Sequence, residues 1–283
     1  MTTPSMFRSP GGIESVPSPR PAPASSPNRV VVGIDCSFWG LAALSWAAEQ
    51  ARLAGADLDL RAAADAVPDR VLDHRIDEIR HAMSTRTVPV SLSADPASAL
   101  IGESRRASLV VLGCRGNNQR GLGIDAAVPI VVQGAACDVV VVGGRMDAVQ
   151  GAHRQISALI NGSGVADIVR AAVRVAAQRD SGLRIVCHVS PVGSGPARHS
   201  VGRLGSFRDA IDLAHRLAPR IPIEIEVIQG GPHEVVAGLT GTDLLVVGVG
   251  QQLDRLAWDA LYHARSPVLL TRSRTVTTDS RRR

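Results

Sequence analysis

Residues 107–116 read ASLVVLGCRG, and residues 242–251 read TDLLVVGVGQ. In both stretches an aliphatic run follows one or two small or polar residues and leads to a glycine. A short run that is apolar on both sides predicts a strand buried on both faces, which is typical of parallel sheets covered by helices. Because the two stretches lie 135 positions apart, we expect the same strand twice in one chain.

A second correspondence extends the repeat toward the start of the chain. The sequence IDCS at 34–37 matches INGS at 160–163, at an offset of 126. Short aliphatic runs alternate with segments of helical period throughout both copies, which predicts an α/β fold. Expected strands are 30–34, 58–63, 88–92, 109–112 and 139–142, then 155–160, 183–189, 223–228, 244–247 and 268–270. Expected helices are 40–54, 71–83, 96–105 and 127–133, then 165–178, 207–217, 232–239 and 256–263.

The repeat also sets the predicted domain boundaries. We predict two copies of one domain, at residues 29–146 and 153–271, with a Gly/Ser/Pro loop at 190–205 accounting for the larger offset in the second copy. The first 28 residues contain seven prolines and many serines, so we expect a disordered arm. Residues 272–283 are expected to form a basic tail.

Charge and composition exclude several classes of function. The formal net charge is +5, but residues 29–270 hold 24 arginines and 24 acidic residues, so the excess lies in the two tails. A neutral folded part argues against nucleic-acid binding, as does an aromatic content of 2 %. Without a signal peptide or an apolar run of 18 residues, we expect a cytoplasmic protein that does not enter membranes.

Two loops are the expected ligand face of the first copy. In an open parallel sheet, a ligand binds beyond the carboxyl ends of the strands, where the strand order reverses. This rule selects residues 33–37 after the first strand and residues 113–116 after the fourth. The histidines form no recognisable catalytic or metal-binding motif, so no enzyme activity is expected.

These loops carry a family resemblance. The sequence VVVGIDCS at 30–37, together with VVLGCRG at 110–116, resembles the universal stress protein family. The resemblance covers residues 29–143 and about 154–271 and suggests the tandem form found in actinobacteria. It implies two Rossmann-like domains, each with a five-stranded parallel sheet in the order 3-2-1-4-5 and helices on both faces. The two copies would be related by a pseudo-twofold axis through their last strands.

The resemblance also implies a nucleotide site, which this chain matches in part. The family pattern is Gly, two residues, Gly, nine residues and then Gly-Ser or Gly-Thr, with an Asp after the first strand that contacts adenosine. Asp35, Gly113 and Gly116 match, but residues 126–127 are Ala-Ala, and Asp125 adds a negative charge where phosphates would lie. We therefore expect a degenerate site with at most weak ATP binding. In the alternative interpretation, the glycines only turn the chain and Asp35 caps the following helix.

The second copy departs further from the pattern. Asn161 stands in place of the Asp, Gln251 replaces the second glycine, and only Gly248 is kept. The segment before the last strand is six residues shorter than in the first copy, so no Gly-Ser pair can be placed. No nucleotide binding is expected in the second copy.

Two cysteines allow a different hypothesis. If the first and fourth strands are neighbours, Cys36 and Cys114 lie on adjacent loops, within the distance that a disulfide accepts. Helix N-termini beside them would lower their pKa values and make the pair redox-sensitive. The alternative is that both are small residues kept reduced in the cytosol.

The leading functional prediction is a non-catalytic stress-response or signalling module with a degenerate adenine-nucleotide site. One alternative is an ATP-binding regulator that uses the first copy alone. Another is an interaction scaffold that recruits protein partners, not identified by the sequence, through the polyproline segment at 17–23 of the proline-rich arm at 1–28. A monomer or a homodimer is expected.

Overall fold

The computed structural model describes residues 28–35, 37–63, 70–82, 91–116, 124–161, 164–189, 198–250 and 252–272. The proline-rich arm before residue 28, Cys36 and the basic tail after Arg272 lie outside the described residues. The predictions made for these parts of the chain therefore stay predictions.

The strands of the described residues form one continuous sheet of ten strands, in the order β3-β2-β1-β4-β5-β10-β9-β6-β7-β8. The first five strands are β1 (Arg29–Ile34), β2 (Asp57–Ala63), β3 (Ser91–Ser93), β4 (Leu109–Gly113) and β5 (Asp138–Val142). The other five are β6 (Gln155–Ile160), β7 (Gly182–Val189), β8 (Ile223–Gln229), β9 (Leu244–Val249) and β10 (Val268–Arg272).

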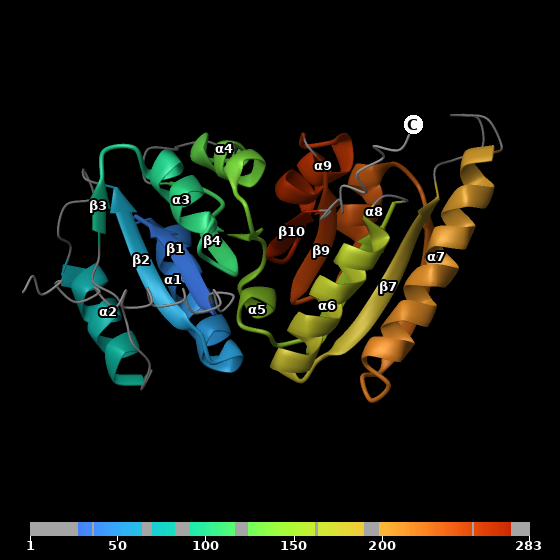
Figure 1. Ribbon diagram of the computed structural model, residues 1–283, viewed down its shortest axis with the longest axis horizontal. Coiled ribbons are helices and arrows are strands. Elements are labelled where there is room, and N and C mark those ends of the chain that lie inside the picture. Colours follow the sequence, from blue (N-terminus) through green and yellow to red (C-terminus); the bar gives the residue numbers. More distant parts are fainter. Residues whose placement is uncertain are drawn as a thin grey trace, which may run out of the picture.

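Each half of the sheet has the expected strand order 3-2-1-4-5, read inward from its own edge. All strand pairs within a half are parallel. The halves meet where β5 pairs with β10 in antiparallel register, with Val140 opposite Leu269 at the centre. Figure 1 shows the two halves side by side, with β10 close to the line where they meet.

Helices cover both faces of the sheet, as the buried aliphatic strands require. One face packs against α1 (Phe38–Ala54), α2 (Arg70–Ala82), α6 (Val165–Arg179) and α7 (Arg198–Leu217). The other packs against α3 (Pro96–Ser104), α4 (Ala127–Gly134), α8 (Pro232–Gly238) and α9 (Arg255–His263), which lie along the top in Figure 1. None of the helices that the structure describes is both long and apolar enough to span a membrane.

Local sequence explains where several helices begin. The predicted start of α3 is confirmed, because the Asp95 side chain accepts a hydrogen bond from the Ser98 amide at 3.1 Å and Pro96 follows in the first turn. Helix α1 begins after Ser37, whose buried hydroxyl accepts from the Gly40 amide at 2.9 Å. It ends at Gly55, which has φ of 58°.

Two segments differ from the sequence-based expectation, and a third is described only in part. Helix α7 begins at Arg198, so the predicted loop at 190–205 is wrong from that residue on. No proline follows Pro196 in this segment, and the buried Phe207, Ala210 and Ala214 anchor the helix to the sheet. A short helix, α5 (Met146–Val149), lies in the predicted joining segment. Strand β3 is described from residue 91, since residues 83–90 lie outside the described part.

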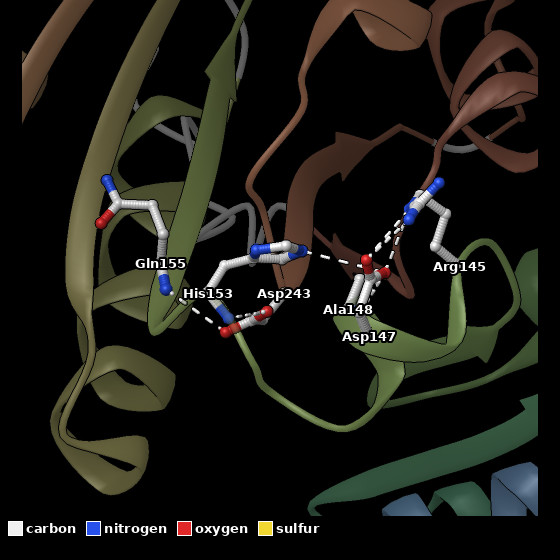
Figure 2. A network of polar contacts seen from close by, with 6 residues as sticks. All are labelled: Arg145, Asp147, Ala148, His153, Gln155 and Asp243. Atoms are coloured by element: carbon white, nitrogen blue, oxygen red, sulfur yellow. Dashed lines mark hydrogen bonds and ion pairs between the residues drawn. The ribbon is translucent and has the colours of Figure 1, made fainter.

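The segment that joins the halves is tied to the second half by a polar network. Figure 2 shows the buried carboxylate of Asp243 accepting from the His153 amide at 3.0 Å and from the Gln155 amide at 3.4 Å. Asp147 accepts hydrogen bonds from the guanidinium of Arg145, which lower the pKa of the Asp147 carboxyl. The end of the joining segment is therefore tied to the second half by Asp243, whereas the Arg145–Asp147 pair lies within the segment.

Candidate functional site

The fold brings the two predicted ligand loops together. Strands β1 and β4 are parallel neighbours, so Asp35, which follows β1, and Gly113, which ends β4, lie at the same edge of the sheet. This edge is the carboxyl end of the first half, where the strand order reverses. The expected meeting of the two loops is therefore confirmed, and the chemistry depends on the side chains found there.

Asp35 organises the start of α1, but it is not the residue that caps the helix. Its carboxylate accepts hydrogen bonds from both the amide and the hydroxyl of Ser37, at 3.2 and 2.5 Å. The Ser37 hydroxyl caps α1. The sequence-based alternative, in which Asp35 itself is the cap, is wrong because the serine two residues later is better placed to reach the Gly40 amide.

Gly113 is required by the packing of the backbone around it. A Cβ at this position would lie 2.7 Å from the backbone carbonyl of Trp39 and 2.9 Å from the Gly40 amide nitrogen. The end of β4 therefore touches the first turn of α1 backbone to backbone. This contact accounts for the glycine without any ligand.

Gly116 lies between two carboxylates. A Cβ on Gly116 would lie 2.6 Å from an oxygen of Asp125 and 3.0 Å from an oxygen of Asp35. Both acidic side chains thus face the loop that holds phosphates in the family pattern. Two negative charges at this point repel a phosphate group.

Asp125 also occupies the helix N-terminus that the pattern assigns to phosphate. Its carboxylate accepts a hydrogen bond from the Ala127 amide at 2.8 Å, in the first turn of α4. An anion at a helix N-terminus is favoured by the free amides and the helix dipole. In this chain an internal carboxylate already makes that interaction.

The second half has the same arrangement at the corresponding helix. The Asp254 carboxylate accepts from the Ala257 amide at 2.8 Å and caps α9. Asn161 follows β6, as the sequence predicts, whereas Gly248 lies within β9, which extends two residues beyond the predicted strand. Gln251 lies outside the described residues. Sequence reasoning missed Asp254 as a cap, although an Asp three residues before the capped amide is a detectable signal.

Cys114 does not have the properties predicted for a reactive thiol. It is buried, and burial raises its pKa to about 11, against the lowering expected from a helix N-terminus. The proposed pairing with Cys36 cannot be described, because Cys36 lies outside the described residues. A thiol with this pKa stays protonated at neutral pH and is a poor nucleophile.

Other groups add little further chemistry at this edge. Arg115 lies between Cys114 and Gly116, and its side chain makes no ion pair or hydrogen bond with the residues that the structure describes. The same residues contain no group of three or more His, Cys, Asp or Glu side chains that could hold a metal ion. The crevice therefore contains the carboxylates of Asp35 and Asp125 beside the guanidinium-bearing residue Arg115.

Comparison with known proteins identifies the fold. No family model and no curated protein matches the sequence. The structure is similar to that of a universal stress protein from Archaeoglobus fulgidus, with a TM-score of 0.64 and 14 % identity over 87 % of this chain and 98 % of that one. It is also similar to a candidate universal stress protein from Pseudomonas aeruginosa, with a TM-score of 0.61 and 15 % identity over 87 % and 94 % of the two chains.

A third solved structure with this fold is the cytoplasmic domain of a prokaryotic cation chloride cotransporter. It matches with a TM-score of 0.59 and 14 % identity, over 87 % of this chain and 95 % of that one. At these identities the comparisons establish the fold of universal stress proteins for the chain, and the site residues must be judged on their own geometry.

Proposed function

We propose that the chain is a non-catalytic stress-response or signalling module, built from two tandem copies of the universal stress protein fold, whose adenine-nucleotide site is degenerate. The likeness in fold over 87 % of the chain supports the family assignment. The repeated strand order, read inward from both edges of the sheet, supports two five-stranded copies.

One observation supports the proposal that the nucleotide site is degenerate. In both halves an aspartate, Asp125 or Asp254, accepts a hydrogen bond from the first turn of the helix that follows the fourth strand of that half. In the family pattern, this helix start carries the Gly-Ser pair that holds phosphates. A phosphate would have to displace the carboxylate and approach a second negative charge, Asp35, in the first half.

The cost of these changes sets the expected affinity. A charge-assisted contact to a phosphate contributes about 1.5 to 3 kcal/mol, or one to two decades in affinity. The first half lacks the serine hydroxyl and the close-approach glycine, since residues 126 and 127 are alanines. We therefore expect ATP to bind with a dissociation constant of about 100 μM or above, and we expect no hydrolysis.

Calorimetry with ATP and magnesium on the purified chain tests the proposal. A variant that restores the pattern, Asp125→Leu with Ala126→Gly and Ala127→Ser, should bind ATP at least tenfold more tightly than the wild type. Asp125→Asn is the matched control, because an amide oxygen can keep the hydrogen bond to the Ala127 amide while the charge is removed.

The proposal fails if the wild-type chain is purified with one equivalent of ATP, as measured by mass spectrometry after denaturation. It also fails if wild-type binding is tight and is abolished by Asp35→Ala. Either result would favour the alternative of an ATP-binding regulator that uses the first half.

A further inference from the structure

A cavity of about 160 Å³ lies between the two halves of the sheet. Its wall includes Cys114 and Gly143 from the first half and the last turn of α9, with Leu261 and Tyr262, from the second half. It adjoins the crevice described above but is not lined by Asp35, Gly113 or Gly116. The cavity therefore belongs to the junction of the halves.

At the end of α4, the space that corresponds to this cavity is filled by a side chain. The antiparallel pairing of β5 with β10 is centred on Val140 and Leu269, so equal steps along the two strands reach equivalent positions. Three residues beyond Val140 stands Gly143, and three residues beyond Leu269 stands Arg272. The first half thus has no side chain where the second half has an arginine.

The guanidinium of Arg272 shows what this position can bind. It donates hydrogen bonds to the carbonyl oxygen of Val132, at 2.6 Å, and to that of Gln133. Both carbonyls belong to the last turn of α4, where a helix leaves carbonyl groups without amide partners and carries partial negative charge. Arg272 therefore satisfies the end of α4.

The end of α9 has the same geometry but no such donor. Ala135 and Ala264 are the matching residues after the two helices, and each donates its amide to the carbonyl four residues earlier, at 2.8 and 3.1 Å. Counting back from them, Leu261 and Tyr262 of α9 correspond to Val132 and Gln133 of α4. No described residue donates a hydrogen bond to the carbonyl oxygen of Leu261 or Tyr262.

We infer that this cavity is a binding site for a guanidinium group, carried by a small guanidine or by an arginine side chain of a peptide. The carbonyl groups of Leu261 and Tyr262 would accept its hydrogen bonds, as those of Val132 and Gln133 accept from Arg272. A cavity of about 150 Å³ holds a benzene-sized molecule. An arginine side chain beyond its Cα is of similar size, with seven non-hydrogen atoms.

The positive charge of Arg115 allows the charge of the ligand to be tested. It also lines the cavity, and its equivalent in the second half is Gly250. A second cation at the wall repels a guanidinium, so the variant Arg115→Gly should bind one at least fivefold more tightly than the wild type. An anion would show the opposite response, since Arg115 would be its main attraction.

The test is a calorimetric titration of the full chain with propylguanidinium. Propylurea is the control, because it has the same number of non-hydrogen atoms and no charge. We expect one propylguanidinium per chain, with propylurea bound at least tenfold more weakly. Gly143→Arg should abolish binding by supplying an internal guanidinium, although its Cβ would lie 2.9 Å from the Cys114 sulfur.

Arg272→Ala provides a second test that does not disturb the cavity. It should create a second propylguanidinium site at the end of α4, raising the stoichiometry from one to two. Titration with the peptide Gly-Arg-Gly separates the two sources, since tighter binding than that of propylguanidinium points to a peptide and weaker binding to a small guanidine. The inference is wrong if propylguanidinium binds neither wild type nor Arg115→Gly, or if butyrate binds better and loses affinity in Arg115→Gly.

Discussion

The guanidinium of Arg179 lies 4.4 Å from the centre of the Trp46 ring. The contact joins α6 of the second half to α1 of the first, and Gln50 extends it by accepting from the Arg179 Nε at 2.9 Å. Burial lowers the pKa of Arg179 to about 10. A half-buried cation thus links the two halves on the face opposite the cavity, together with the β5–β10 pairing.

Replacing Arg179 should weaken the junction. A desolvated cation–π contact contributes about 2 kcal/mol and a hydrogen bond about 1 kcal/mol, so Arg179→Ala should lower the free energy of unfolding by about 3 kcal/mol. Arg179→Met keeps the aliphatic stem against Trp46 and should lose less. Urea unfolding measures both. An unchanged urea midpoint for Arg179→Ala would contradict the stabilising role of the Arg179–Trp46 contact. The control is Arg52→Ala, on the exposed side of α1.

The network in Figure 2 should also contribute to stability. Asp243→Ala would leave the partly buried amides of His153 and Gln155 without their acceptor, which should cost about 1 to 3 kcal/mol. Asp147→Ala removes an exposed ion pair with Arg145 and should change little. Urea unfolding of the two variants compares them directly, and equal losses would show that the buried carboxylate has no special role.

One sheet position carries opposite charges in the two halves. Asp59 pairs with Val31 across β2 and β1, and Arg184 pairs with Ser157 at the equivalent place across β7 and β6. Asp59 is fully buried and forms an ion pair with Arg29, whereas Arg184 lies 3.3 Å from Glu224. Each half therefore pairs this position with side chains of the opposite sign.

Removing the buried acid should leave Arg29 with Glu103 as its remaining ion-pair partner. Asp59→Ala should cost about 1 to 3 kcal/mol, because it removes one of the two carboxylates that Arg29 contacts, while Glu103 stays at 3.0 Å. The double variant Asp59→Leu with Arg29→Met should recover most of this loss, since both charges are then absent. Thermal unfolding followed by circular dichroism tests the pair. A double variant less stable than Asp59→Ala would contradict the electrostatic explanation.

Two buried thiols predict how stability depends on alkaline pH. Burial raises the pKa of Cys114 to about 11 and that of Cys137 to about 12, whereas an unfolded thiol ionises near about 8.5. Between these values the unfolded chain binds fewer protons than the folded one, so stability falls as pH rises. The slope should be about 1.4 kcal/mol per pH unit for each thiol between pH 9 and 11.

The measurement is urea unfolding at several pH values from 8 to 11. Compared with the wild type, Cys137→Ala should lose the contribution of one thiol to this slope, and the double variant with Cys114→Ala should lose both. Parallel pH profiles for all three proteins would show that the two thiols are not the cause.

Gly113 provides a steric test of the candidate site. Gly113→Ala would place a Cβ 2.7 Å from the Trp39 backbone, so we expect a loss of about 1 to 3 kcal/mol without any nucleotide present. Gly102→Ala is the matched control in α3, because no atom lies within 4 Å of its added Cβ and alanine favours a helix by about 1 kcal/mol. Equal stability of Gly113→Ala and wild type would contradict the steric explanation and favour a ligand-binding role for Gly113.

The sequence by itself determined the elements and their repetition. The strands at 109–113 and 244–249 and the start of α3 at Asp95 follow from local patterns, because aliphatic runs and helix caps act over only a few residues. The order 3-2-1-4-5 came from a resemblance carried by the loops after β1 and β4, and the sheet has that order in both halves. The positions of Asp35 and Gly113 at one edge follow from that order.

Only the tertiary structure decided what those residues do. Asp35 and Asp125 meet across Gly116, Arg179 reaches Trp46, and Arg272 reaches the end of α4. Each of these contacts joins residues far apart in the chain, and no local pattern of hydrophobicity or propensity encodes them. The meeting of Asp35 with Asp125 depends on the order of β1 and β4 within the first half. The other two contacts depend on the antiparallel pairing of β5 with β10 and on the packing of helices on the sheet, which place side chains from both halves within a few ångströms of each other.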